Sequence, residues 1–147
     1  MDFRGITDEF MLYGTLFALS NRIQTFVDGK LKGITAKQQF LLIVLSLFEE
    51  AKPSLKEVAG VIGCSYQNVK RMADSLEKSG FLLVERDAND KRKYNLSATE
   101  KFVDFSLETG QAGYDFMQGL YQGISQEDLR CTLKTLEKME QNLRLES

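Results

Sequence analysis

The sequence contains no histidine, and this absence narrows the chemistry open to the protein. Histidine is the commonest general base and the commonest metal ligand, so its absence argues against an enzyme and against a bound metal. The only two cysteines, Cys64 and Cys131, are far apart and form no metal-binding pattern. Carboxylates such as Glu49 and Glu50 come with no nucleophile, phosphate-binding loop or metal cluster. We therefore expect no catalytic site, no metal and no cofactor.

The sequence also lacks an apolar run long enough to cross a membrane. The longest run, residues 40–48, is interrupted by Ser46 and is shorter than the roughly 20 residues that a bilayer requires. A signal peptide begins with basic residues and continues with an apolar stretch. The first residues here are acidic and lack this layout, so no signal peptide is expected. Two widely spaced thiols suit a reducing compartment. These features predict a cytoplasmic protein with no membrane partner.

Positive charge is in slight deficit, because the formal net charge is −2 at pH 7. This argues against a histone-like protein that holds nucleic acid by bulk charge. It leaves open a specific binder in which basic residues gather on one face. With 147 residues, the chain is long enough for one domain with a substantial core.

Residues 55–80 are the most informative stretch and have the pattern of two helices joined by a tight turn. A first helix is expected over residues 55–62, and Gly63 then suits a turn with positive φ. Ser65 can cap a second helix. Its inward face is apolar at helical spacing and consists of Val69, Met72, Ala73 and Leu76. Such a helix-turn-helix places its second helix in the major groove of DNA, although an ordinary helical hairpin is the alternative interpretation.

A predicted hairpin follows the two helices. Residues 81–84 form a short apolar strand, and the polar turn over residues 87–93 carries basic side chains. Tyr94 and Leu96 alternate with the polar residues Asn95 and Ser97, which predicts a second, antiparallel strand. A hairpin directly after a helix-turn-helix is a wing, and its basic tip favours DNA binding. A solvated loop is the alternative explanation of these charges.

A further helix is predicted before this motif. Thr35 and Gln38 have the spacing of a capping box, which marks a helix start. We expect the helix to run to about Glu50, before Pro53, the only proline. Because it is apolar on nearly every side between residues 40 and 48, it should lie in the middle of the domain.

Both ends of the chain are predicted to be helical. Thr7 can cap a first helix, whose apolar stripe suits either the core or a second subunit and consists of Leu12, Leu16, Leu19, Ile23 and Phe26. Thr99 can cap a long helix, and Gly110 and Gly113 should kink this helix or let another helix pack closely. Ser125 starts the last helix, whose narrow stripe suits a partner helix and consists of Leu129, Leu133, Leu136, Met139 and Leu143.

This order of elements resembles the MarR (multiple antibiotic resistance regulator) family of bacterial winged-helix transcription factors. The likeness runs from Ile34-Thr35 and Gln38 to Thr99-Glu100-Lys101, and its most specific part is Asp90-Lys91-Arg92, which is similar to the family's Asp-x-Arg signature. The sequence departs from the family where Val84-Glu85 replaces basic residues and where Phe102 replaces a glycine. The resemblance implies a mostly α (α+β) fold, a winged helix-turn-helix with N- and C-terminal dimerisation helices and a two-stranded wing.

The resemblance also implies an organisation and a function. Residues 1–147 would form a single domain, with residues 34–98 as the DNA-binding lobe and residues 1–33 and 99–147 as dimerisation helices. The expected function is that of a transcriptional repressor, which binds a near-palindromic operator in double-stranded DNA as a homodimer. Arg92 would enter the minor groove, with Asp90 holding it in place. The alternatives are a winged-helix module for protein–protein contact without DNA binding, and an oxidant-sensing regulator that acts through Cys64.

Candidate DNA-binding residues follow from helical geometry and from the wing. Steps of about 100° per residue place Gln67, Lys70 and Arg71 opposite the apolar face of the second helix. Glutamine can pair with adenine and arginine with guanine in the major groove, whereas Ser65 at the helix N-terminus suits phosphate. Tyr66 is expected to pack toward the core. The complete set of candidates is Ser65, Gln67, Asn68, Lys70, Arg71, Asp90, Lys91, Arg92 and Lys93.

Finally, the resemblance implies a small aromatic ligand, bound in a cleft between the dimerisation helices and the DNA-binding lobe. Four aromatic residues are candidates for lining this cleft, namely Tyr13, Phe17, Phe40 and Phe105. Their helical spacing favours an ordinary core, and lining of a ligand cleft is the alternative. Cys64 is expected to pack inside the turn as an apolar residue. The alternative is a stabilised thiolate, because Cys64 precedes a helix N-terminus.

Overall fold

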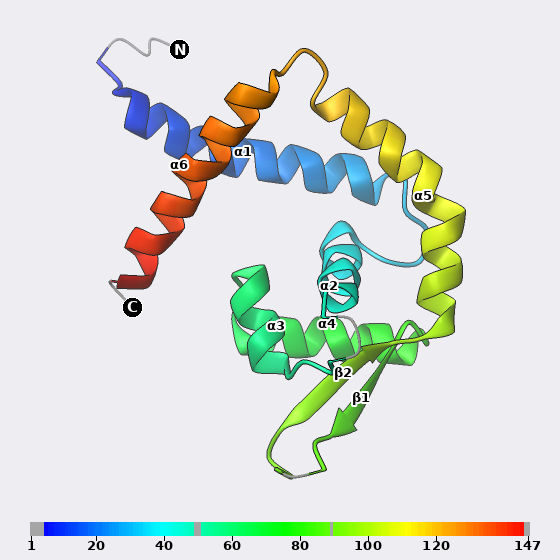
Figure 1. Ribbon diagram of the computed structural model, residues 1–147. Helices are drawn as coiled ribbons and strands as arrows, with labels where there is room; N and C mark the ends of the chain where they lie inside the picture. The colour runs from blue at the N-terminus through cyan, green and yellow to red at the C-terminus, as the bar shows by residue number, and fades with distance from the viewer. Residues whose placement is uncertain (1–4, 49–50, 89, 146–147) are drawn as a thin grey trace. The chain divides into compact units, whose positions relative to one another are not determined.

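The computed structural model describes residues 5–48, 51–88 and 90–145, which form six helices and one two-stranded antiparallel sheet (Figure 1). The chain divides into two compact units, residues 1–105 and residues 106–147. The mostly α, winged-helix fold class expected from the sequence is confirmed. The finer division into a DNA-binding lobe and dimerisation helices stays a prediction. Among the described residues, no helix is both long and apolar enough to cross a membrane.

The first unit is built around helix α2, which spans Ala36–Ser46. The predicted capping box is present, because the Thr35 hydroxyl accepts from the Gln38 N–H at 3.3 Å and the Gln38 carbonyl oxygen accepts from the Thr35 N–H at 2.8 Å. Leu41, Leu42 and Val44 are buried, and α2 packs on the helix-turn-helix and on the wing. The expected central position is therefore confirmed.

Helix α2 ends earlier than the apolar pattern suggested. Its last residue is Ser46, and the N–H groups of Leu47 and Phe48 bond three residues back, to Val44 and Leu45, in a tighter turn. The predicted end at about Glu50, together with Glu49, lies outside the described residues. One side of the helix is open, because Phe40 and Ile43 are nearly half exposed.

Helices α3 (Leu55–Ile62) and α4 (Tyr66–Lys78) form the helix-turn-helix. Gly63 has φ 72°, the left-handed conformation expected of the turn glycine. Ser65 caps α4 as predicted, because its hydroxyl accepts from the Asn68 N–H at 3.3 Å. Ala59 is 6% exposed and Val69 is fully buried, and α3 packs on α4.

The wing consists of strands β1 (Leu82–Arg86) and β2 (Tyr94–Ala98). Their antiparallel register pairs Leu82 with Ala98 and Arg86 with Tyr94. The first strand is thus shifted relative to the predicted residues 81–84, because Glu85 and Arg86 also pair across the hairpin and Phe81 packs in the core before the strand begins. In addition, the Pro53 carbonyl oxygen accepts from the Leu96 N–H at 2.9 Å, which fastens the segment before α3 to the wing.

Helix α1 spans Asp8–Asp28 and begins at the predicted cap, Thr7. None of its residues is buried within the protomer, so its stripe does not form the core of this single chain. Several of its large apolar side chains are about half exposed or more, namely Phe10, Met11, Tyr13, Phe17 and Phe26.

Helix α5 spans Glu100–Leu120 and crosses the boundary between the two units. Phe102 is buried in the first unit. The Thr99 hydroxyl, expected to cap α5, donates to the Gly80 carbonyl oxygen at the end of α4 (2.7 Å). The helix continues without a break through Gly110 and Gly113, and a Cβ at either position would meet no described atom within 4 Å. The predicted kink, or close packing of another helix at these glycines, stays a prediction, because they lie in the second unit.

Helix α6, in the second unit, spans Gln126–Leu145. The predicted start is confirmed, because Ser125 accepts from the Asp128 N–H at 3.0 Å. Along the predicted apolar stripe, Leu129, Leu136 and Met139 are half-buried, whereas Leu133 and Leu143 are exposed.

Candidate nucleic-acid interface

Helix α4 presents one polar face to solvent and buries the opposite one. Val69, Ala73 and Leu76 are fully buried, and the predicted outward residues Gln67 and Arg71 are exposed. This follows from the helical repeat, which sets every third or fourth residue on the same face. The polar face is therefore free, within the described protomer, to meet a groove of DNA.

Two side-chain contacts order this face before any partner binds. The guanidinium of Arg71 donates to the side-chain carbonyl oxygen of Asn68, one turn earlier. The ammonium of Lys70 lies 3.6 Å from the carboxylate of Asp74. The first contact restricts the arginine, so less side-chain entropy would be lost when it binds a base. The second leaves the helix face less basic than its lysine alone suggests.

The N-terminus of α4 is open toward solvent. The Asn68 N–H bonds to the hydroxyl and the carbonyl oxygen of the cap residue Ser65, which is itself exposed. Tyr66 is 44% exposed, so the expectation that it packs toward the core is wrong. It is the first residue of the helix. An exposed hydroxyl-bearing ring at the start of this helix is a feature that helical periodicity alone did not indicate.

The wing tip is held together by carboxylates. Asp90 accepts from the backbone N–H of Arg92 at 3.1 Å and from its side-chain Nε at 3.3 Å. Asp87 in turn accepts from the Asp90 N–H at 2.8 Å and from the Asn95 side chain at 2.8 Å. The arrangement expected from the Asp-x-Arg resemblance, with the aspartate holding the arginine, is present. The Arg92 side chain is 90% exposed, and Lys91 and Lys93 are also exposed.

The base of the wing carries charges that the sequence pattern alone did not relate to one another. Glu85, which departs from the family pattern, lies 2.5 Å from the ammonium of Lys52 in the segment before α3. Its negative charge is therefore balanced locally. Arg86 lies over the ring of Tyr94, 5.7 Å from the centroid. No local signal pointed to Lys52, because its partner is 33 residues away.

One carboxyl near the wing has a perturbed pKa. The Ser54 hydroxyl and the Ser54 backbone N–H both donate to Glu57 at the start of α3, at 2.6 and 2.7 Å. These two hydrogen bonds, and more weakly the charge of Lys93, hold the pKa of Glu57 below its ordinary value of 4.5. The carboxylate is therefore charged at neutral pH and completes the capping box of α3.

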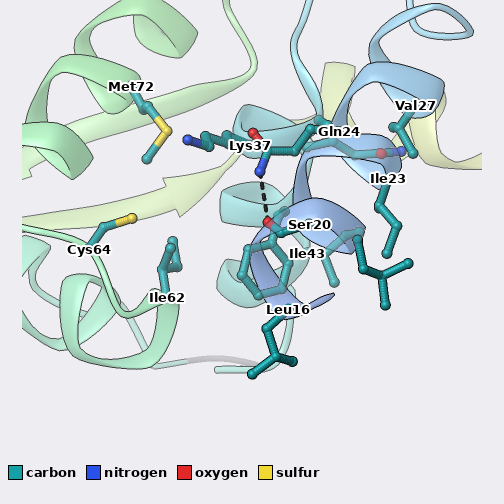
Figure 2. A pocket seen from close by; sticks show the side chains of 14 residues that line it. Leu16, Ser20, Ile23, Gln24, Val27, Lys37, Ile43, Ile62, Cys64 and Met72 are labelled. Carbon is teal, nitrogen blue, oxygen red and sulfur yellow. Dashed lines mark hydrogen bonds between the residues drawn. The ribbon is translucent and has the colours of Figure 1, made fainter. Parts of the chain in front are cut away.

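A cavity of about 630 Å³ lies in the first unit between α1, α2 and the helix-turn-helix (Figure 2). Ile62, Cys64 and Met72 face it from the helix-turn-helix, and on α1 the Gln24 amide donates to the Ser20 hydroxyl at 3.0 Å. Among the described residues that line it, Lys37 alone carries a charge. The complete lining is Leu16, Leu19, Ser20, Ile23, Gln24, Val27, Ala36, Lys37, Gln39, Phe40, Ile43, Ile62, Cys64 and Met72.

Of the four aromatic residues predicted to line a ligand cleft, Phe40 lines this cavity. Tyr13 and Phe17 lie toward the start of α1, where their exposed rings contact each other edge to face at 5.0 Å. Phe105 is half-buried and packs on Phe81 at 5.5 Å, as part of the core. Within the described protomer, these three residues therefore do not line the cavity.

The two cysteines have different surroundings. Cys64 is half-buried against the core and lines the cavity, in agreement with the expected packing. Cys131 is exposed on α6.

Comparison with known proteins finds a family model and a relative that match this chain. The model of the MarR family matches residues 34–94. The chain is 29% identical over 120 residues to the transcriptional repressor MprA of Escherichia coli K12, covering 77% of this chain and 68% of MprA.

Solved structures share the fold of this chain. A MarR protein from Peptoclostridium difficile is 21% identical, with a TM-score of 0.82 over 99% of this chain and 94% of its own. MepR of S. aureus in complex with DNA is 22% identical, with a TM-score of 0.79 over 89% of this chain and 97% of its own.

Proposed function

We propose that this chain is a transcriptional repressor of the MarR family, which binds specific sites in double-stranded DNA as a homodimer. The observation that carries the proposal is the combination of an ordered polar face on α4 with a basic wing tip in the same compact unit. MepR, which shares this fold, has been solved bound to DNA, and the relative MprA is a transcriptional repressor. Because the proposed target is DNA, we place the protein in the cytoplasm.

In the proposed complex, α4 lies in the major groove. Gln67 pairs with adenine and Arg71 with guanine, each through two hydrogen bonds to the base edge. Asn68 supports Arg71 and adds a contact to a base or phosphate. The open helix N-terminus and Ser65 bind a phosphate, where the helix dipole favours negative charge. Lys70 adds a phosphate contact.

The wing makes the second, separate contact. Arg92 enters the narrow, electronegative minor groove of A·T-rich DNA, and Asp90 holds the turn from which it extends. Lys91 and Lys93 contact phosphates, which strengthens binding without reading sequence. The Lys52–Glu85 pair supports this assignment, because it prevents an unbalanced negative charge at the base of the wing.

Homodimer formation is supported by large apolar side chains that the protomer leaves exposed. On α1, Phe10 and Phe17 are 65% and 60% exposed, and in the second unit Leu143 of α6 is 69% exposed. Large apolar side chains left exposed on one element favour an interaction site there. A two-fold dimer would also explain a near-palindromic operator. Light scattering at micromolar concentration should give about twice the chain mass of 16.7 kDa, and a monomer would contradict the assignment.

The cavity is the proposed site of a small, mostly apolar ligand that modulates DNA binding. Its volume of about 630 Å³ is within the usual range for small-molecule sites. Apolar walls, including Phe40, suit an aromatic ring, and Lys37 and Gln24 supply polar contacts. Saturation with such a ligand should raise the thermal midpoint and change the affinity for DNA, because binding to the folded state stabilises it.

Selection of bound sites from a random pool of double-stranded DNA tests the proposed function. The enriched site should be nearly palindromic, with half-sites about one helical turn apart. Affinity for this site should fall linearly with salt on a log–log plot, because phosphate contacts release counterions. A pool that enriches no site, or binding without a salt slope, would instead favour a winged-helix module for protein–protein contact.

A further inference from the structure

The side chain of Gln38 connects helix α2 to the recognition helix α4. Its carbonyl oxygen accepts from the backbone N–H of Thr35 at 2.8 Å, within the capping box. Its Nε2 donates to the hydroxyl of Ser75 at 3.0 Å, 37 residues further along the chain. Because the Thr35 N–H must meet an acceptor, the orientation of the amide is determined, and its NH₂ group faces α4. The oxygen and the nitrogen of the Gln38 amide therefore each make a hydrogen bond, one at the start of α2 and one to α4.

Ser75 lies on the flank of α4, between its buried and its polar faces. At about 100° per residue, it lies roughly 40° around the helix from Arg71 and roughly 100° from the buried Leu76. The buried residues hold α4 by apolar packing, which is not directional. A hydrogen bond on the flank is directional, so it acts on how far the helix is rotated about its own axis. The bond from the Val84 N–H to the Glu77 carboxylate, at 3.0 Å, is a second directional contact and joins α4 to β1.

We propose that Gln38 is a positioning residue for DNA recognition, which sets the rotation of α4 through Ser75 and thereby aims Arg71 and Gln67 at the bases. This inference rests on the proposed DNA-binding function. Gln38 itself touches no DNA in this scheme. A change in rotation affects base contacts, which require well-aligned hydrogen bonds, more than it affects phosphate contacts, which are mainly electrostatic.

The same turn of α2 is also held from the other side. The Asp28 carboxylate, at the end of α1, accepts from the Ala36 N–H at 2.6 Å. Ala36, Lys37 and Gln39 line the cavity, whereas the intervening Gln38 reaches α4. The first turn of α2 therefore contacts α1 and α4 and also forms part of the cavity wall.

The test compares Ser75→Ala, Gln38→Ala and the double variant for binding to the selected operator and to non-specific DNA. One hydrogen bond of this kind corresponds to a change of about three- to tenfold in an equilibrium constant. Ser75→Ala should weaken operator binding by that factor while non-specific affinity stays unchanged. Its melting temperature should not fall, because alanine is a better helix former than serine and the capping box remains. Ser79→Ala is the matched control, because the Ser79 hydroxyl bonds only locally, to the Ser75 carbonyl oxygen at 3.0 Å, and its loss should leave specificity unchanged.

The double variant distinguishes positioning from direct contact. If Gln38 acts through Ser75, the double variant should discriminate operator from non-specific DNA no worse than Gln38→Ala alone. Full additivity would show that the Ser75 hydroxyl acts on DNA directly and would overturn the proposal. The proposal would also be overturned if the wild-type protein recognises an operator and Ser75→Ala recognises it with the same specificity. Failure of the wild-type protein to select any site would overturn the proposed function itself, and this inference with it.

Discussion

Replacement of Arg92 by alanine should weaken DNA binding while leaving the fold almost unchanged. The side chain is 90% exposed and its Nε lies 3.3 Å from Asp90. An exposed ion pair of this kind contributes about 0–1 kcal/mol. The backbone N–H of Arg92 keeps its bond to Asp90 in the variant, so the wing turn should persist. The free energy of unfolding should fall by no more than about 1 kcal/mol, which shifts the melting temperature by about 2–4 °C.

The expected loss of DNA affinity is larger. If each wing arginine neutralises the equivalent of one phosphate, the log–log salt slope loses about 0.9 per wing. At 0.1 M salt this corresponds to about eightfold weaker binding per wing, and about sixtyfold per dimer. The loss should be greatest for operators with A·T-rich flanks, where the minor groove is narrow and most negative.

Fluorescence anisotropy with labelled operator, between about 50 and 200 mM salt, measures both the affinity and the slope. Arg92→Lys is the matched control, because it keeps the charge but loses the planar guanidinium. It should retain most of the salt slope and lose the preference for A·T-rich flanks. Arg92→Ala protein that binds as tightly as wild type at every salt concentration would refute the assignment of this residue to the DNA interface.

Three further predictions concern base reading, helix capping and the core. Arg71→Ala should cost about 1–3 kcal/mol and relax specificity at one base position; equal weakening in gel shifts against all operator variants would contradict a base contact. The lowered pKa of Glu57 means that its capping bonds stabilise the fold above its ordinary pKa of 4.5 and stop doing so as pH falls through the lowered value. In urea titrations, Glu57→Ala should therefore be less stable than wild type at pH 7, and the difference should disappear in acid; a difference independent of pH would contradict the role of the charge. Leu41→Ala, at a fully buried site in α2, should lower the free energy of unfolding by about 2–5 kcal/mol, measured by the same titration; a loss below about 1 kcal/mol would show that α2 is not central to the core.

Features that depend on neighbouring residues could be predicted from the sequence. The starts of α1, α2, α4 and α6 follow from Thr7, Thr35, Ser65 and Ser125, because a capping side chain bonds to a backbone N–H only a few residues away. The left-handed turn at Gly63 is equally local. The polar face of α4 followed from the helical repeat, which applies wherever a helix lies on a core.

Features that depend on the limits of the core could not be predicted in this way. Helical periodicity places Tyr66 near the inward side of α4, yet this first residue of the helix is 44% exposed. Apolar composition extended α2 past Ser46, but the chain turns more tightly at that point. Likewise, Phe105 packs on Phe81 against the core and does not line the cavity.

The sequence by itself determined which helices form, where most of them begin, that a wing follows the helix-turn-helix, and which basic residues belong to each. Tertiary structure decided how these elements are held relative to one another within the first unit. Gln38 meets Ser75, Lys52 meets Glu85, and Pro53 meets Leu96, across separations of 37, 33 and 43 residues. Capping and periodicity act within a few residues, whereas contacts across such distances exist only after the core around α2 has brought the segments together.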